Sequence, residues 1–295
     1  MTGGIEMDWI RSFQKAIDYI EDHITEPLDF NRIAQEMNIS GFYFQKIFTI
    51  ICGFSLGEYI RSRRLTLAGS ELISTDNKII DIAFKYGYDT PEGFTRAFTR
   101  FHGITPMSAR KRSGGLKSFA KLSIAITMKG GSIMNYKIVE KDSFKVLEKV
   151  EKHSIDDAQN KNTIPEFWMR SHTDGTVKTL LEQTNDKQFI FGICYGNIPK
   201  DTKAFDYGIA ALYGGGIVPE GFRIKEIPAR TWAVFECKGP LPSAIQTTWH
   251  KICTEFFPTS GYQPTYEMDI EAYTDTKNMP ADDYYCEIWV TVEKK

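Results

Sequence analysis

A pattern that occurs twice in the first third of the chain constrains the fold more than any other feature. The two segments are IAQEMNIS-GFYFQKIFTIICG-FS and IAFKYGYD-TPEGFTRAFTRFHG-IT. In each, Ile-Ala lies in a first short helix, aromatic residues line a second, and a glycine (Gly53 or Gly103) follows its end. Two helices joined by a tight turn, present twice, predict an all-α region with two helix–turn–helix units.

The second helix of the later unit carries apolar and basic residues on different faces. Phe94, Phe98 and Phe101 stand at i, i+4 and i+7, which places them on one buried stripe. Arg96 and Arg100, one turn apart, fall on a neighbouring face. Taken alone this predicts either a surface helix with solvated arginines or a helix that presents them to a ligand.

Composition limits the class of protein. The 295 residues suffice for two domains, and 42% hydrophobic with 25% charged residues is typical of a globular chain. The five cysteines are scattered without CxxC spacing, and the N-terminus lacks a signal-peptide pattern. We therefore expect a cytoplasmic protein with reduced thiols, no metal, no cofactor and no membrane segment.

Charge is distributed unevenly along the helical region. Residues 41–112 carry eleven basic and six acidic residues, a local charge of +5, whereas the whole chain has a net charge of −2. A basic face of this kind favours binding to a phosphate backbone.

The pattern changes after Arg112. SGGLKS (113–118) is typical of a linker, and the remainder is rich in strand-like segments such as RTWAVFECKG, YEMDIEAYT and YYCEIWVTV. Two helical stretches, each with a tryptophan (Trp168 and Trp249), interrupt them. We expect an α+β domain built from two duplicated strand-helix-strand-strand modules.

These motifs resemble two known families. The first 112 residues are similar to the DNA-binding domain of AraC/XylS transcription regulators, through Ile33-Ala34, Gln45 to Phe48 and Gly53-Phe54-Ser55, and through Ile82-Ala83, Gly87-Tyr88, Phe94, Arg96, Phe98, Gly103 and Thr105-Pro106. Residues 119–295 resemble GyrI-like effector-binding domains of the Rob and BmrR type, through GFRIKEIPARTWAVF, the KGP step, SGYQP, DIEAY and EIWV.

The first resemblance implies binding to double-stranded promoter DNA, with one recognition helix in each of two adjacent major-groove segments. Its base-reading positions correspond here to Phe42, Gln45, Lys46, Glu92 and Arg96. Arg can fork onto guanine, Gln onto adenine, and Phe suits a thymine methyl. Glu92, after Pro91, departs from the polar amides common in the family, and either accepts from cytosine or weakens phosphate affinity.

Other residues of this region suit the DNA backbone. The candidates for phosphate contacts are Arg61, Arg63, Arg64, Thr95, Arg100 and Thr105. For the arginines of the long connecting helix, the alternative is a solvated helix surface. A single chain carries both units, so specific binding does not require a dimer.

The second resemblance implies a groove that binds amphipathic, often cationic, small molecules around a central acidic residue. Glu271 is the first candidate and Glu287 the second, because each lies among aromatic residues in an apolar strand, where an unpaired carboxylate is costly. The expected walls are Phe167, Trp168, Tyr195, Tyr213, Tyr273 and Trp289. Alternatively, either glutamate pairs with a lysine or arginine across the sheet, and the aromatic residues form the core.

Three classes of function follow. The first, which the fused DNA-binding domain favours, is a one-component regulator, expected to be an activator, that senses a small molecule and contacts RNA polymerase. The second is a hydrolase of electrophilic toxins, with Glu271 as base and Tyr195 or Tyr273 as its partner. The third is a protein-binding module. We expect the first, without catalytic residues.

Overall fold

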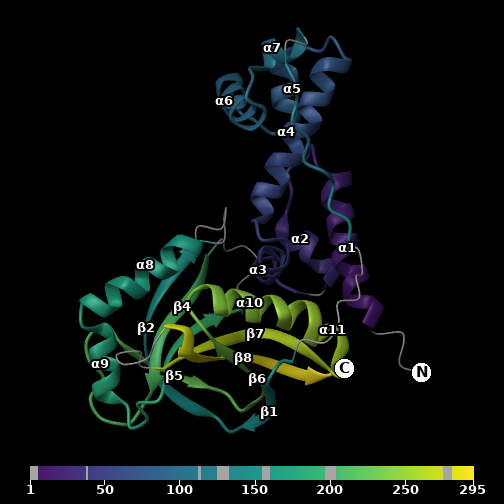
Figure 1. Ribbon diagram of the computed structural model, residues 1–295. Helices are drawn as coiled ribbons and strands as arrows, with labels where there is room; N and C mark the ends of the chain where they lie inside the picture. Colours follow the sequence, from purple (N-terminus) through teal and green to yellow (C-terminus); the bar gives the residue numbers. More distant parts are fainter. Residues whose placement is uncertain are drawn as a thin grey trace.

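A computed structural model of the chain separates a helical region from a sheet region (Figure 1). It describes residues 6–37, 39–111, 114–124, 133–154, 160–196, 204–274 and 281–295. Figure 1 shows helices α4 to α7 extending away from the sheet, whereas α3 lies close to it. The all-α region followed by an α+β region agrees with the sequence pattern.

The helical region begins with α1 and continues as the two expected helix–turn–helix units. The first unit packs around Phe44 and Phe48, and the second around Phe94 and Phe98; all four rings are fully buried. The elements are α1 (Glu6–Asp22), α2 (Phe30–Ala34), η1 (Gln35–Met37), α3 (Gly41–Cys52), α4 (Leu56–Ser74), α5 (Ile79–Lys85), α6 (Pro91–His102) and α7 (Pro106–Arg110).

The two units also share their helix ends. Ser40 caps the start of α3 and Thr90 that of α6, each accepting from the backbone N–H three residues on. Gly53 (φ 78°) and Gly103 (φ 82°) end the same helices in the left-handed conformation, which glycine adopts without steric cost. The caps therefore give α3 and α6 the same length and place them alike in their units.

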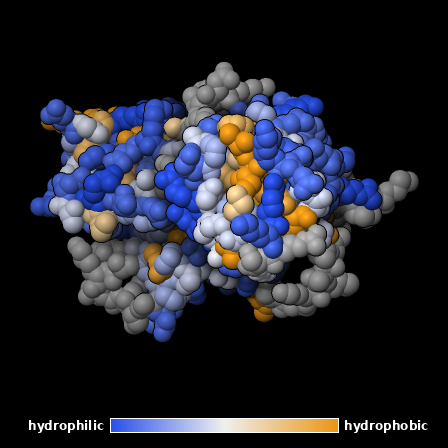
Figure 2. All heavy atoms as spheres, turned by 90° about the horizontal axis from the view of Figure 1, so that it is seen from above, coloured by the Kyte–Doolittle hydropathy of each residue, from blue (hydrophilic) through white to orange (hydrophobic). Residues whose placement is uncertain are grey.

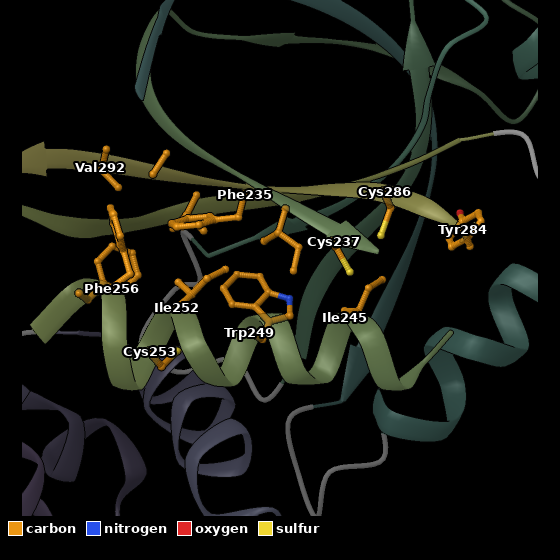
Figure 3. Packing of buried hydrophobic residues seen from close by; sticks show 14 residues of the cluster. Phe235, Cys237, Ile245, Trp249, Ile252, Cys253, Phe256, Tyr284, Cys286 and Val292 are labelled. Carbon is orange, nitrogen blue, oxygen red and sulfur yellow. The ribbon is translucent and has the colours of Figure 1, made fainter. Parts of the chain in front are cut away.

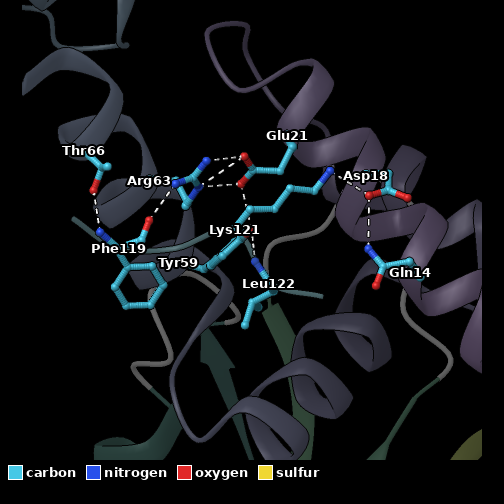
Figure 4. Close-up of polar contacts among 9 residues, drawn as sticks. All are labelled: Gln14, Asp18, Glu21, Tyr59, Arg63, Thr66, Phe119, Lys121 and Leu122. Carbon is cyan, nitrogen blue, oxygen red and sulfur yellow. Dashed lines mark hydrogen bonds and ion pairs between the residues drawn. The ribbon is translucent and has the colours of Figure 1, made fainter. Parts of the chain in front are cut away.

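Residues 116–124 lie along the helical region (Figure 4). The N–H of Phe119 donates to Thr66, that of Leu122 to the Tyr59 hydroxyl, and that of Ile124 to Gln14, at 2.8–3.1 Å. The expected linker at 113–118 and effector-binding domain from 119 therefore need correction. Residues 119–124 pack with the helices, and the first strand, β1, begins only at Tyr136.

The sheet region contains one antiparallel sheet in the order β1-β6-β8-β7-β3-β4-β2-β5. If β1–β4 exchange places with β5–β8, in the same sequence, the strand order reads the same from the opposite edge of the sheet. In each half two strands, rather than the expected one, precede the helical segment. The elements are β1 (Tyr136–Lys141), β2 (Phe144–Ser154), α8 (Asn160–Thr173), α9 (Thr176–Gln183), β3 (Ile190–Tyr195), β4 (Ala204–Leu212), β5 (Arg223–Ile227), β6 (Arg230–Lys238), α10 (Ser243–Lys251), η3 (Ile252–Phe256), α11 (Phe257–Thr259), β7 (Tyr262–Tyr273), η4 (Ala281–Asp283) and β8 (Tyr285–Lys294).

Helices cover one face of this sheet. Helices α8 and α9 pack on the side of β2, β3 and β4, and α10 with η3 packs over β6 and β8 through residues such as Trp249 and Ile252 (Figure 3). A separate apolar cluster, which includes Trp232, Ile270 and Trp289, gathers on the opposite face. Alternation along each strand thus decides which side chains point toward the helices.

The outer end of the helical region exposes apolar side chains. Ile73, Ile80, Phe84 and Met107 are each at least 40% exposed. Figure 2 looks onto this end and shows apolar residues gathered in a strip between hydrophilic ones. Among the helices that the structure describes, none is long and apolar enough to cross a membrane.

Candidate functional site

The recognition helix of the second unit, α6, presents a polar face to solvent. Glu92, Arg96 and Arg100 are exposed at i, i+4 and i+8, and Thr95 is half-buried beside them. Pro91 occupies the first helical turn, where its missing N–H costs nothing. The side chains predicted for DNA contact on α6 therefore share one accessible side of the helix.

The corresponding helix of the first unit, α3, does not. Phe42 is only 3% exposed, because its ring packs 4.3 Å from that of Phe205 on β4. Gln45 and Lys46 are half-buried. We expected this face of α3 to be exposed for reading bases, and in this structure the sheet region covers it.

The arginines of α4 differ from one another. Arg63 binds the Glu21 carboxylate through Nε and Nη2 at 2.8–3.1 Å and donates to the Phe119 carbonyl at 2.6 Å (Figure 4). Arg64 donates to the carbonyls of Ile24 and Glu26. Both were expected to contact phosphates, but their guanidinium groups instead join parts of the helical region. Arg61 and Thr105 are exposed.

A cavity of about 820 Å³ lies between α3 and the sheet. Its floor comes from β3, β4 and β7 through residues that include Gly192, Tyr207 and Glu271. Helices α8 and α9 form one wall, α10 the other, and α3 with the start of α4 closes the top through Phe42, Gln45, Lys46, Thr49, Ile50 and Leu56. The volume suits a drug-sized molecule.

An ion pair between the two regions stands at the edge of this cavity. The Lys46 ammonium contacts both carboxylate oxygens of Asp269 at 2.7 and 2.8 Å, and the buried Tyr43 hydroxyl donates to the same carboxylate at 3.0 Å. The ammonium also lies 4.5 Å from the centre of the Trp249 ring. Burial alone would lower the pKa of Lys46, but the charge of Asp269, its hydrogen bond to the ammonium and the neighbouring Cys194 and Glu271 together outweigh burial and raise that pKa, so the lysine stays protonated.

Glu271 is two residues further along β7 and faces the same cavity. Trp249 Nε1–H donates to one carboxylate oxygen at 2.9 Å, and the Tyr273 hydroxyl donates to the other at 2.6 Å. Burial, followed by the charge of Glu271, raises the pKa of Tyr273 well above its usual value, which keeps the phenol protonated as a donor. Within the described residues no lysine, arginine or histidine forms an ion pair with this carboxylate.

The structure brings together three of the eight predicted ligand residues. Glu271, Trp168 and Tyr273 line the cavity, whereas Phe167 is buried in the neighbouring core and Tyr213 bonds to the Gly216 carbonyl at the end of β4. Glu287, Trp289 and Tyr195 lie on the opposite face of the sheet, because each sits one residue out of step with the cavity-facing positions of its strand.

Glu287 has an ion-pair partner instead. Lys137 on β1 contacts it at 3.3 Å, while Tyr285 and Trp289 donate to it at 2.9 and 2.7 Å. The alternative interpretation, a cross-sheet ion pair, therefore describes Glu287. In the described part of the chain no cluster of His, Cys, Asp or Glu could hold a metal ion.

Sequence reasoning missed Asp269, Trp249 and Tyr207 as cavity residues. Two of them carried a signal: Asp269 shares a strand face with Glu271, and Trp249 is the tryptophan of the second helical stretch. Tyr207 accepts a hydrogen bond from Trp168 Nε1–H at 3.0 Å, a contact between residues 39 positions apart.

A duplicated helix–turn–helix region joined to a ligand-sized cavity defines a regulator with an effector-binding domain. A helix–turn–helix family model matches residues 33–112, and a model described as "Integron-associated effector binding protein" matches residues 137–292. The chain therefore belongs to the AraC/XylS-type transcription regulators and carries a GyrI-like effector-binding domain of the integron-associated family.

Curated relatives match the helical region. The regulatory protein SoxS of Salmonella typhimurium is 40% identical over 99 residues, which cover 34% of this chain and 92% of SoxS. The transcriptional activator AarP of Providencia stuartii is 38% identical, over 33% of this chain and 72% of AarP. The transcriptional regulator Rob of Salmonella typhimurium is 33% identical, over 36% of this chain and 37% of Rob. These names describe regulators, and they give no support to the hydrolase alternative.

Solved structures resemble the sheet region. SAV2435 bound to tetraphenylphosphonium has 22% identity and a TM-score of 0.47, over 54% of this chain and 94% of that one. An integron cassette protein of Vibrio cholerae has 19% identity and a TM-score of 0.39, over 54% of this chain and 95% of that one.

Proposed function

We propose that this regulator activates transcription in response to a lipophilic cation that binds in the cavity between the sheet and α3. The observation that carries the proposal is Glu271, whose carboxylate faces an aromatic-lined cavity and is held by two neutral donors, Trp249 and Tyr273. A carboxylate with neutral donors and no cationic partner among the described residues is suited to binding a cation from outside, and rings around it favour a cation with apolar substituents.

We propose further that DNA is bound through two adjacent major-groove segments, one for each unit, and that the bound regulator recruits RNA polymerase. The exposed Arg96 supports the DNA contact. The name of AarP, a relative described as an activator, supports activation. A reporter placed downstream of a duplex selected by the protein should rise in expression when the cation is added.

Binding of a lipophilic cation is tested by measuring thermal melting of the full chain with and without tetraphenylphosphonium. A ligand that binds only the native state stabilises it by about 2.7 kcal/mol at one hundred times its Kd. We expect Glu271→Gln to remove most of the shift. Glu287→Gln, the same change on the opposite face of the sheet, should retain it.

Triphenylphosphine oxide, a neutral analogue of similar bulk, separates charge from shape. It should stabilise the protein far less than the phosphonium. An equal shift with the neutral compound, or an unchanged phosphonium shift in Glu271→Gln, would exclude Glu271 as the cation-binding group.

A further inference from the structure

Helix α3 has two roles that exclude each other. It is the recognition helix of the first unit, yet it also forms the top of the effector cavity. Phe42 and Tyr43 belong to the apolar cluster of Phe205 and Tyr207 in the sheet region rather than to the core of their own unit. A recognition helix enters the major groove with its N-terminal residues, and here these residues are buried.

We propose that the sheet region sequesters α3 through the Lys46–Asp269 ion pair, and that a cationic effector releases α3 by taking the place of the lysine in the acidic part of the cavity. The second half of this inference rests on the proposed function; the first half does not. In the docked state only α6 is available to DNA. Effector binding makes α3 available as well.

The charges at the cavity edge support competition. Asp269 and Glu271 bring two carboxylates to one strand face, and Lys46 forms an ion pair with Asp269 alone, although the charges of both carboxylates raise its pKa, Asp269 more than Glu271. A second cation beside Glu271 would repel the ammonium in a site where water screens poorly. Lys46 can leave because it reaches the carboxylate from a separate region, whereas Asp269 is fixed in β7.

The ring contacts support the same competition. The Lys46 ammonium lies over Trp249, whose indole N–H also donates to Glu271. A lipophilic cation that binds Glu271 would therefore lie beside the same indole that the ammonium now contacts. Lys46 therefore acts as a built-in cation that fills part of the site before the effector arrives.

Linkage then fixes the sign of the response. If effector binding and docking of α3 oppose each other, the effector strengthens DNA binding, and DNA that engages α3 strengthens effector binding by the same factor. Coupling of this kind typically amounts to about tenfold to a hundredfold in affinity.

The test uses the full chain and a pool of random DNA duplexes, so that no operator needs to be known. Wild type without effector should select one conserved block, read by α6. Asp269→Asn should select two blocks about one helical turn apart and bind the two-block duplex about tenfold more tightly than wild type. Glu287→Gln, which breaks the ion pair of a buried glutamate with the exposed Lys137 on the opposite face, is the matched control and should behave as wild type.

Amide hydrogen exchange of residues 41–52 measures docking directly. Exchange should accelerate in Asp269→Asn and in wild type with tetraphenylphosphonium. Should Asp269→Asn fail to fold, Phe42→Ser removes the contact with Phe205 and should release α3 by a different route. Two blocks selected by wild type without effector, or unchanged exchange in a folded release variant, would overturn sequestration.

The two proposals fail separately. Absence of a melting shift with tetraphenylphosphonium, together with two blocks for Asp269→Asn, would leave sequestration standing and reject the cation as effector. A melting shift without faster exchange of residues 41–52 would instead overturn the competition between effector and Lys46.

Discussion

Lys46 and Arg96 occupy the same position in the two recognition helices, seven residues before the glycine that ends each one. Arg96 stands exposed on α6, whereas Lys46 is held on Asp269. The two helices share caps, length and buried phenylalanines, so the difference does not arise within the units. It arises because the sheet region covers only one of them.

Replacing Arg96 by alanine should weaken binding to a selected duplex by about 1–3 kcal/mol, because a fork of two hydrogen bonds to guanine is lost. Binding to unrelated DNA should change much less. The exposed side chain adds little to folding, so the helix content measured by circular dichroism should be retained. Undiminished discrimination between selected and unrelated duplexes in a gel-shift titration would remove Arg96 from the DNA interface.

Replacing Arg63 by methionine should act on folding rather than on DNA. The Arg63–Glu21 pair is nearly buried, and removing one partner of such a pair costs about 3 kcal/mol. Burial alone would raise the pKa of Glu21, but hydrogen bonds from Arg63 and Tyr59 lower it. These donors therefore stabilise the ionised form of the Glu21 carboxylate. Urea denaturation measures the loss. Arg61→Ala, on the exposed side of α4, should leave stability nearly unchanged and weaken DNA binding instead.

Acid should destabilise the second unit through His102. The ring is 4% exposed: Lys117 N–H donates to Nδ1, so Nε2 carries the proton and donates to the Leu65 carbonyl. Burial lowers the pKa of His102 below its usual 6.5. The unfolded chain therefore binds more protons, and stability that is complete above pH 6.5 is lost as the pH falls toward the folded-state pKa.

Melting curves at pH 7.5 and 5.5 should show this loss, and His102→Gln should reduce it. Part of the pH dependence should persist in the variant, since burial also lowers the pKa of His153. An identical pH dependence in wild type and His102→Gln would show that His102 does not titrate in this range.

Adding a methyl group to the cavity floor should obstruct ligand binding. A Cβ on Gly192 would collide with the Tyr207 hydroxyl and stand 3.3 Å from the Trp168 ring. We expect Gly192→Ala to cost about 1–3 kcal/mol of stability and to abolish stabilisation by tetraphenylphosphonium. The control is Gly115→Ala, where the added Cβ would meet no atom within 4 Å, and it should have no effect on either measurement. Gly221→Ala would not serve as a control, because Gly221 has positive φ.

Local structure could be predicted from the sequence because its causes are local. Helical spacing of the phenylalanines, the Ser and Thr caps and the terminal glycines predict both units, and period-two alternation places Glu271 with Asp269 and Tyr273 on one strand face. The same alternation could not say which face of the sheet the helices cover. For this reason the sequence predicts Glu287 and Trp289 as cavity residues, like Glu271, whereas both lie on the opposite face of the sheet.

Contacts between distant segments could not be predicted. Nothing near Lys46 in the sequence indicates that Asp269, 223 positions away, neutralises it. The sequence predicts that Phe42 contacts a thymine methyl, because an apolar residue at a base-reading position suits that contact. The packing of Phe42 on Phe205 has no local signal. The sequence likewise predicts that Arg63 contacts phosphate, and its contacts with Glu21 and Phe119 have no local signal either.

Because residues 116–124 pack along the helices, the stretch of chain that joins the two regions is short. Only residues 125–135 separate Ile124, bonded to Gln14, from the first strand. A chain of that length spans at most about 40 Å, so a released sheet region stays near α3 at a millimolar effective concentration. Redocking is therefore a unimolecular event. The balance between closed and open states should depend on the effector concentration and remain the same however many copies of the protein a cell contains.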